Sequence, residues 1–216
     1  MKEDVRGPRL DCDVVCSSLE ILSNDYDDTL AKVQAMASAL EAKYPYNRAH
    51  SDRVVAIAEA VADELGLDGE DRSAIVQAAE LHDLGKIAVP GEILTKPAKL
   101  TAQEREVVQR HPWVAACLLS RLLYSDQCIS LVYHHHEWYN GGGYPTRRTG
   151  GEIPLGSRVI AVADAFDAMT SDRPYRKAMP LQAAQRELEN CAGTQFDPEV
   201  VDALFKACHK KRVIAD

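Results

Sequence analysis

A chain of 216 residues suffices for one well-buried core and is marginal for two, so we expect one main domain. The formal net charge of -8 argues against bulk DNA binding, because that mode depends on many basic contacts to phosphates. No apolar stretch approaches the length of a membrane span, and the polar amino terminus lacks the apolar segment of a secretion signal, so we expect a cytoplasmic protein.

Apolar residues recur at helical spacing along most of the chain, and no alternating strand pattern occurs. Gly66 and Gly85 are natural stops for two of these segments. Thr101 and Glu104 form a capping-box pattern, and Pro112 suits the first turn of a helix. The predicted helices span residues 29–41, 51–65, 71–84, 112–123, 125–136, 158–170, 181–191 and 198–208, with another beginning near residue 101.

Residues 140–156 hold six glycines and two prolines, so they cannot form a regular helix and are expected to be a long Gly-rich loop. The first 25 or so residues are less clearly patterned. We therefore expect residues 1–27 to be an N-terminal leader or linker helix. Residues 28–216 are expected to form one all-α domain, a single compact helical bundle.

The six cysteines are scattered, with no Cys-x-x-Cys pair and no dense disulfide framework. We expect reduced thiols, several of them small core residues. The six are Cys12, Cys16, Cys117, Cys128, Cys191 and Cys208.

Five histidines and two aspartates occupy unusual local settings. Asp83 and Asp164 lie in otherwise apolar segments, where burying a lone carboxylate is costly unless a cation or hydrogen bonds compensate it. Singly, each residue has an ordinary explanation, such as a helix boundary for His111 or a buried salt bridge for Asp164. Together they favour a metal site with nitrogen and oxygen ligands, which suits Fe, Mn or Zn. The set comprises His50, His82, Asp83, His111, His135, His136 and Asp164.

Several strings around these residues resemble motifs of the HD-GYP family within the HD hydrolase superfamily. The string His82–Lys86 resembles the HD signature, and His135–Glu137 followed by Gly143–Pro145 resembles the motif that defines the family. The resemblance extends from about residue 29 to about residue 205. Further agreement lies in the segments that begin at His50, Arg110 and Val162.

The resemblance implies an HD-superfamily helical bundle with a Gly-rich GYP loop and two divalent transition-metal ions. Fe or Mn are the foremost candidates, with Zn, Ni or Co as alternatives. The implied ligands of one ion are His50, His82, Asp83 and Asp164; those of the other are His111 and one or both of His135 and His136, with Asp83 bridging. Relatives with a third metal carry a carboxylate where this chain has Tyr46, so we expect two ions.

The resemblance also implies a phosphodiesterase of bacterial second-messenger signalling, which hydrolyses cyclic di-GMP to linear pGpG or GMP through a metal-bridging hydroxide. Its catalytic residues would be Asp83 and Lys86. From the residues alone, Lys86 could instead be solvated, and Asp167 could be a plain salt-bridge partner. The implied substrate contacts are Lys86, Asp167, Arg173, Arg176 and Tyr144.

Other functions stay open at this point. The chain could be a catalytically weak receptor for a cyclic dinucleotide, a partner-docking module, or another HD-superfamily hydrolase acting on cyclic GMP-AMP or a nucleotide. Trp138, Tyr139 and Tyr144 offer aromatic area for a guanine base or for a protein partner at the GYP loop. A homodimer is a further alternative. His134 is expected to contact the metal ligands without binding a metal itself, or to be solvated.

Overall fold

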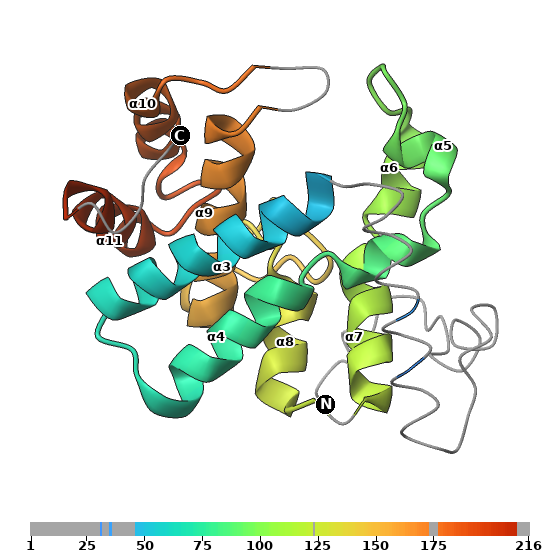
Figure 1. The fold of residues 1–216 in the computed structure, drawn as a ribbon, viewed down its shortest axis with the longest axis horizontal. Coiled ribbons are helices and arrows are strands. Elements are labelled where there is room, and N and C mark those ends of the chain that lie inside the picture. The colour runs from blue at the N-terminus through green and yellow to red at the C-terminus, as the bar shows by residue number, and fades with distance from the viewer. Residues whose placement is uncertain (1–30, 32–34, 36–45, 123, 173–176, 211–216) are drawn as a thin grey trace.

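The computed structural model describes residues 31, 35, 46–122, 124–172 and 177–210. Within these residues the chain is helical and contains no strand, only isolated bridges that pair Asn140 with Thr149 and Ala192 with Phe196. The expected all-α fold is confirmed (Figure 1). The helices are α3 (Tyr46–Glu64), α4 (Gly69–Leu81), α5 (Gly91–Leu94), α6 (Ala102–Val108), α7 (His111–Arg121), α8 (Asp126–His134), α9 (Leu155–Thr170), α10 (Leu181–Cys191) and α11 (Pro198–His209), with 3-10 turns η1 (Leu84–Ala88) and η2 (Gly150–Glu152).

Helix α3 runs through the middle of the molecule and packs against α4, α9 and α11. Helix α8 packs against α4, α7 and α9. In Figure 1 the helices α9, α10 and α11 gather on one side of α3, whereas α5 and α6 lie on the other. The shared core is apolar, because each helix turns its hydrophobic stripe inward. Its fully buried members include Val54, Leu118, Ile160, Phe166 and Leu204.

Helix ends follow the expected chemistry in several places. The hydroxyl of Thr101 accepts from the backbone N–H of Glu104, and the Glu104 carboxylate accepts from the Thr101 N–H, which completes the capping box. Pro112 lies in the first turn of α7, as predicted. Ser125 caps α8 in the same manner as Thr101, through the N–H of Cys128.

Several helix ends differ from the prediction: α3 begins at Tyr46, α9 begins at Leu155 and α8 ends at His134, and the end of α4 also differs. The apolar spacing continues to residue 84, but α4 ends at Leu81, and the chain turns through His82 and Asp83 into η1. A Cβ atom on Gly85 would lie 1.9 Å from the carbonyl oxygen of His111. Glycine thus lets η1 pack directly on α7, a tertiary contact that helical periodicity cannot reveal.

The Gly-rich segment is an ordered connection tied to the body. The N–H groups of Tyr139 and Asn140 donate to the carbonyls of Gln195 and Thr194, at 3.1 and 2.9 Å. A Cβ on Gly143 would lie 2.4 Å from the carbonyl oxygen of His136, so glycine permits the loop to fold back on the end of α8. The loop also contains η2, a short turn that we had not expected.

Several expectations fall outside the described residues or change. The predicted helix over 29–41 lies almost wholly outside them, as do the 1–27 leader and Cys12 and Cys16. Cys117 is disulfide-bonded, so the expectation of reduced thiols is wrong for this cysteine; spacing cannot show which thiols meet in space. Cys128, Cys191 and Cys208 are free thiols. Among the described helices, none has both the length and the apolar character needed to cross a membrane.

Candidate metal centre

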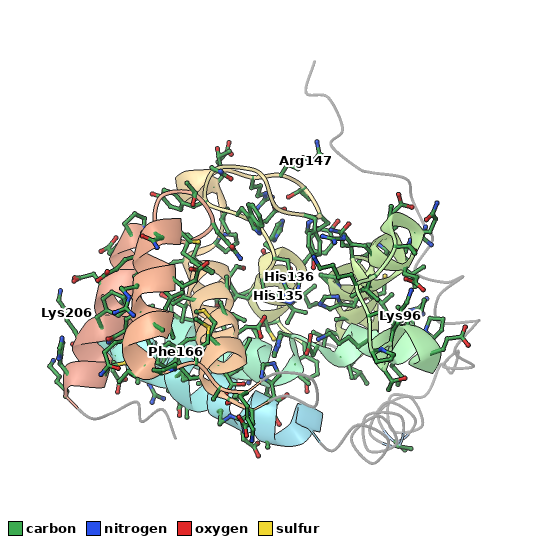
Figure 2. The ribbon with its side chains drawn as sticks, turned by 90° about the horizontal axis from the view of Figure 1, so that it is seen from above. Lys96, His135, His136, Arg147, Phe166 and Lys206 are labelled. Carbon is green, nitrogen blue, oxygen red and sulfur yellow. The ribbon has the colours of Figure 1, made fainter. Side chains whose placement is uncertain are left out.

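Residues far apart in the sequence meet at the centre of the fold. His50 comes from α3, His82 and Asp83 from the turn after α4, and Asp164 from α9. His111 is the first residue of α7, and His135 and His136 follow the last residue of α8. In Figure 2, His135 and His136 lie in the middle of the molecule, between the helix that carries Phe166 and the side that carries Lys96.

Two groups of three ligating side chains are present. In the first, one donor atom each from His50, His82 and Asp83 lie within 4.8 Å of one another. In the second, donor atoms of His111, His135 and His136 meet the same limit, and the Nε2 atoms of His111 and His135 are 3.4 Å apart. Both groups are of a size that one metal ion could bridge.

The carboxylate of Asp83 lies between the two groups. Its Oδ2 atom is 3.9 Å from Nε2 of His50 and 3.6 Å from Nε2 of His82. Its Oδ1 atom is 3.7 Å from Nε2 of His111. One oxygen thus faces each group, which is the arrangement that a carboxylate shared between two cations requires. Lys86, in the middle of η1, donates to Oδ2 at 2.6 Å.

The ring orientations fit metal ligands. Nδ1 of His82, His111 and His135 lies 2.7, 2.8 and 2.6 Å from the carbonyls of Ala79, Val108 and Val132 respectively, so the Nδ1–H donates in each case. In neutral rings, Nε2 is then an acceptor. Nε2 of His82 is buried without a hydrogen-bond partner in the described part of the chain, and His111 and His135 turn two such acceptors toward each other. A cation between them would remove this conflict.

Electrostatics keep the second group neutral. Burial, followed by the neighbouring His136, lowers the pKa of His111 to about 3. Burial lowers the pKa of His136 to about 4 against the pull of Asp164 and Asp83, and it also lowers the pKa of His135. Neutral imidazole is the form that ligates metals, so this group is ready to bind at neutral pH.

In the first group, neighbouring charges favour the charged forms of the side chains. Burial opposes the charged form of His50, but hydrogen bonds to Asp164 and Asp167 and the charges of Asp164 and Asp83 raise its pKa to about 9. Burial likewise disfavours ionised Asp83, yet the charge of Lys86, followed by those of the histidines, holds the pKa of this carboxyl below its ordinary value. A proton on His50 therefore supplies positive charge where a bound cation would supply it.

The other predicted site residues differ in how they relate to the two groups. Oδ1 of Asp164 is 3.3 Å from Nε2 of His50, so Asp164 adjoins the first group. The Tyr144 ring lies 4.9 Å from the His136 ring, and burial raises the pKa of its phenol, which stays protonated. Arg173 and Arg176 lie outside the described residues.

Asp167 is buried and its carboxylate is occupied by several hydrogen-bond donors. Its side chain is 1% exposed and accepts from His50 at 2.6 Å, from Arg53, and from the hydroxyl of Ser171 at 2.9 Å. These bonds match the salt-bridge alternative that the sequence left open for Asp167. The partners Arg53 and Ser171 were missed, although Arg53 follows His50 by three residues and therefore shares its helix face.

Two residues next to the second group, Glu137 and His134, make hydrogen bonds with the surrounding chain. Oε1 of Glu137 accepts from the backbone N–H and the hydroxyl of Thr146, at 2.6 and 2.7 Å, and so fastens the GYP loop to the end of α8. Sequence reasoning gave Glu137 no role of its own. His134 is buried and donates to the carbonyl of Ser130 at 2.9 Å, and it is outside both ligand groups.

An all-helical bundle whose separate helices bring histidines and an aspartate together at its centre is typical of helical proteins with a metal site between helices. The family model described as HD domain matches residues 34–200. The chain therefore belongs to the HD-domain family.

The chain is also similar to individual proteins of known name. The chain is 43% identical over 175 residues to the cyclic di-GMP phosphodiesterase response regulator RpfG of Xanthomonas campestris, covering 79% of this chain and 46% of that protein. A cyclic GMP-AMP specific phosphodiesterase structure from Vibrio cholerae matches with 33% identity and a TM-score of 0.52, over 87% of this chain and 42% of that one. The chain thus spans less than half of each of these two proteins.

A third similarity concerns the fold alone. The HDGYP protein of Bdellovibrio bacteriovorus superposes with a TM-score of 0.63 over 97% of this chain and 74% of that one, at 17% identity. The helical architecture therefore persists where most side chains have changed.

Proposed function

We propose that this chain is a metal-dependent phosphodiesterase that hydrolyses a cyclic dinucleotide, with cyclic di-GMP as its first candidate substrate. The observation that carries the proposal is the Asp83 carboxylate, whose two oxygens face two separate groups of ligating side chains. The names of the relatives, which act on cyclic di-GMP or cyclic GMP-AMP, support the substrate class.

The proposed ligands divide between two ions. His50, His82, Asp83 and Asp164 hold one, whereas His111, His135 and His136 hold the other together with Asp83. Helix α8 ends at His134, and His135 and His136 lie in the turn that follows it, so both can contribute; their ring centroids are 4.0 Å apart. Nitrogen and carboxylate donors without thiolate suit Fe or Mn, with Zn, Ni or Co as alternatives.

A pair of divalent cations supplies a water-derived nucleophile at neutral pH and offsets the charge that develops on the phosphodiester. The protein's part is to hold the reacting groups. Water attacks phosphorus, the bond from phosphorus to the ribose 3′ oxygen breaks, and that oxygen leaves as a hydroxyl with the proton that the water gives up. The first product is the linear dinucleotide pGpG, and a second hydrolysis gives GMP.

Lys86 is proposed to neutralise a non-bridging phosphate oxygen. Its side chain is 26% exposed, and its ammonium already points at Asp83 beside both ligand groups. A substrate phosphate placed over Asp83 comes within reach of this charge. Tyr144 is proposed to contact the substrate from the GYP loop, and Arg173 and Arg176 are proposed to bind its phosphates.

Cyclic GMP-AMP is the second candidate substrate, because the Vibrio cholerae relative acts on it. A docking role for the GYP loop is compatible with either substrate: Trp138 is 40% exposed, and Arg147 lies at the outer end of the loop in Figure 2. A protein partner at this loop is part of the proposal, and so is a homodimer.

The test is to incubate metal-loaded protein with cyclic di-GMP, cyclic GMP-AMP and cyclic di-AMP in separate reactions and to resolve the products by chromatography. We expect linear dinucleotide from cyclic di-GMP, with no product after treatment with a chelator. Tight binding of cyclic di-GMP without turnover at any metal loading would contradict the enzyme proposal and identify a receptor. Faster turnover of cyclic GMP-AMP would reassign the substrate.

A further inference from the structure

We propose that Asp167 is a positioning residue that holds His50 in its metal-binding orientation and does not contact the substrate. The inference rests on the proposed metal centre, and it assigns to Asp167 a role different from the one that the sequence suggested.

His50 differs from His82 and His135 in the partner of its Nδ1 atom. His82 and His135 are C-caps, and each finds a partner for Nδ1 in a carbonyl of its own last helical turn, where carbonyls lack intrahelical partners. His50 lies inside α3, where the carbonyls nearby are engaged in the helix. Its Nδ1 lies instead 2.6 Å from Oδ2 of Asp167, 117 residues away in the sequence.

This bond fixes which nitrogen of His50 faces the other ligands. With Nδ1–H donating to Asp167, Nε2 becomes the atom that faces Asp164 at 3.3 Å and Asp83 at 3.9 Å. Metal-ligating histidines commonly donate their other ring N–H to a carboxylate in this way, which fixes the tautomer and makes the ligand more basic. Asp167 therefore selects Nε2 of His50 as the ligand.

Asp167 is itself held on both oxygens. Oδ1 accepts from Nε of Arg53 and from the Ser171 hydroxyl at 2.9 Å, and Oδ2 accepts a second bond from Arg53 at 3.2 Å as well as the bond from His50. Arg53 comes from α3 and Ser171 from the end of α9. The carboxylate thus ties α3 to α9 at the level of the ligands, and it has little room to reorient.

The exposure of the two aspartates on α9 separates their roles. The Asp164 side chain is 25% exposed and adjoins the first ligand group, whereas the Asp167 side chain, three residues later, is 1% exposed. A substrate could reach Asp164 without rearrangement of the fold. It could not reach Asp167 without displacing Arg53 or His50.

Replacing Asp167 by asparagine removes the charge and one of the two acceptor oxygens. His50 and Arg53 both donate, so an amide that serves one of them turns its NH2 group toward the other. His50 then loses its fixed orientation. We expect the ion at the His50 group to bind about 10- to 100-fold more weakly. His111 and His135 keep their own carbonyl bonds, so the second group should retain its ion.

The experiment is a titration of the chelator-treated full chain with Mn²⁺, with the number of ions bound measured by elemental analysis after equilibrium dialysis. Asp197 provides the matched control, because it is 4% exposed, is paired with Arg158 and accepts from the N–H of Glu199 at 2.9 Å. Asp197→Asn should lower the melting temperature and leave both Mn²⁺ affinities within about twofold of wild type. Asp167→Asn should lose one of the two ions selectively, with its helical circular dichroism unchanged.

Each outcome decides the matter. If Asp167→Asn binds both ions as wild type does but loses turnover, Asp167 contacts substrate and the inference is wrong. Equal loss of both ions would point to a general structural role and also overturn it. If Asp167→Asn does not fold, Arg53→Gln provides the test: unchanged affinity would contradict the inference, and a selective loss at one ion would support it. A wild-type protein that binds no Mn²⁺ would refute the proposed metal centre itself.

Discussion

Replacing Asp83 by asparagine is expected to remove metal from both ligand groups while the fold persists. The change keeps the size of the side chain and deletes one negative charge that faces both groups from 3.6 to 3.9 Å. Two unit charges about 4 Å apart at an effective dielectric constant of about 20 interact by about 4 kcal/mol. At about 1.4 kcal/mol per factor of ten, each divalent ion should bind at least about 1,000-fold more weakly.

The assay is elemental analysis of metal-loaded protein after dialysis, with thermal melting as a check on the fold. Asp63→Asn serves as the control, because Asp63 is an aspartate on α3 that pairs with the exposed side chain of Arg72. We expect full metal content in the control and little in Asp83→Asn. Wild-type metal content in Asp83→Asn would refute the shared role of this carboxylate.

Three further predictions test neighbouring parts of the account. In metal-loaded protein, Lys86→Ala should lower turnover by about 100- to 1,000-fold with metal content and melting temperature nearly unchanged, because the lost donor acts on the phosphate; an equal loss of thermal stability would show that Lys86 is structural. Gly85→Ala should destabilise the fold by at least about 1 to 3 kcal/mol in a denaturant titration, since its Cβ would meet the His111 carbonyl at 1.9 Å, and an unchanged midpoint would contradict the packing of η1 on α7. The pKa of His50 is raised to about 9, so the protonation of His50 contributes fully to the stability of metal-free protein below about pH 6.5, and this contribution is lost as the pH rises through 9. The melting temperature of metal-free protein should decline across this range. A bound cation that replaces the proton should abolish the decline.

Much of the fold follows from local patterns. The apolar stripes predicted the main helices, and residues 181–191 form α10 with the predicted bounds. The end of α4 was predicted three residues too late, because the hydrophobic spacing continues through Leu84 while the close approach of Gly85 to α7 turns the chain earlier. Such a contact joins distant segments and leaves no periodic signal.

The candidate metal ligands could be predicted from the sequence for a different reason. Histidines and aspartates in apolar surroundings are costly unless a partner compensates them, so their identities alone pointed to a shared site. The different burial of Asp164 and Asp167 could not be predicted from the sequence, because both lie on one face of α9 at a spacing of three residues. Only the contacts with Arg53 and Ser171, and the resulting burial, distinguish them.

Hydrolysis of cyclic di-GMP in ¹⁸O-labelled water, followed by mass spectrometry of the products, tests the proposed function most directly. The account predicts that metal-loaded protein yields pGpG with one ¹⁸O atom in its new terminal phosphate, because water attacks phosphorus and the ribose oxygen leaves. Cyclic di-GMP recovered unchanged from protein that carries both ions, or a linear product without the label, would contradict it.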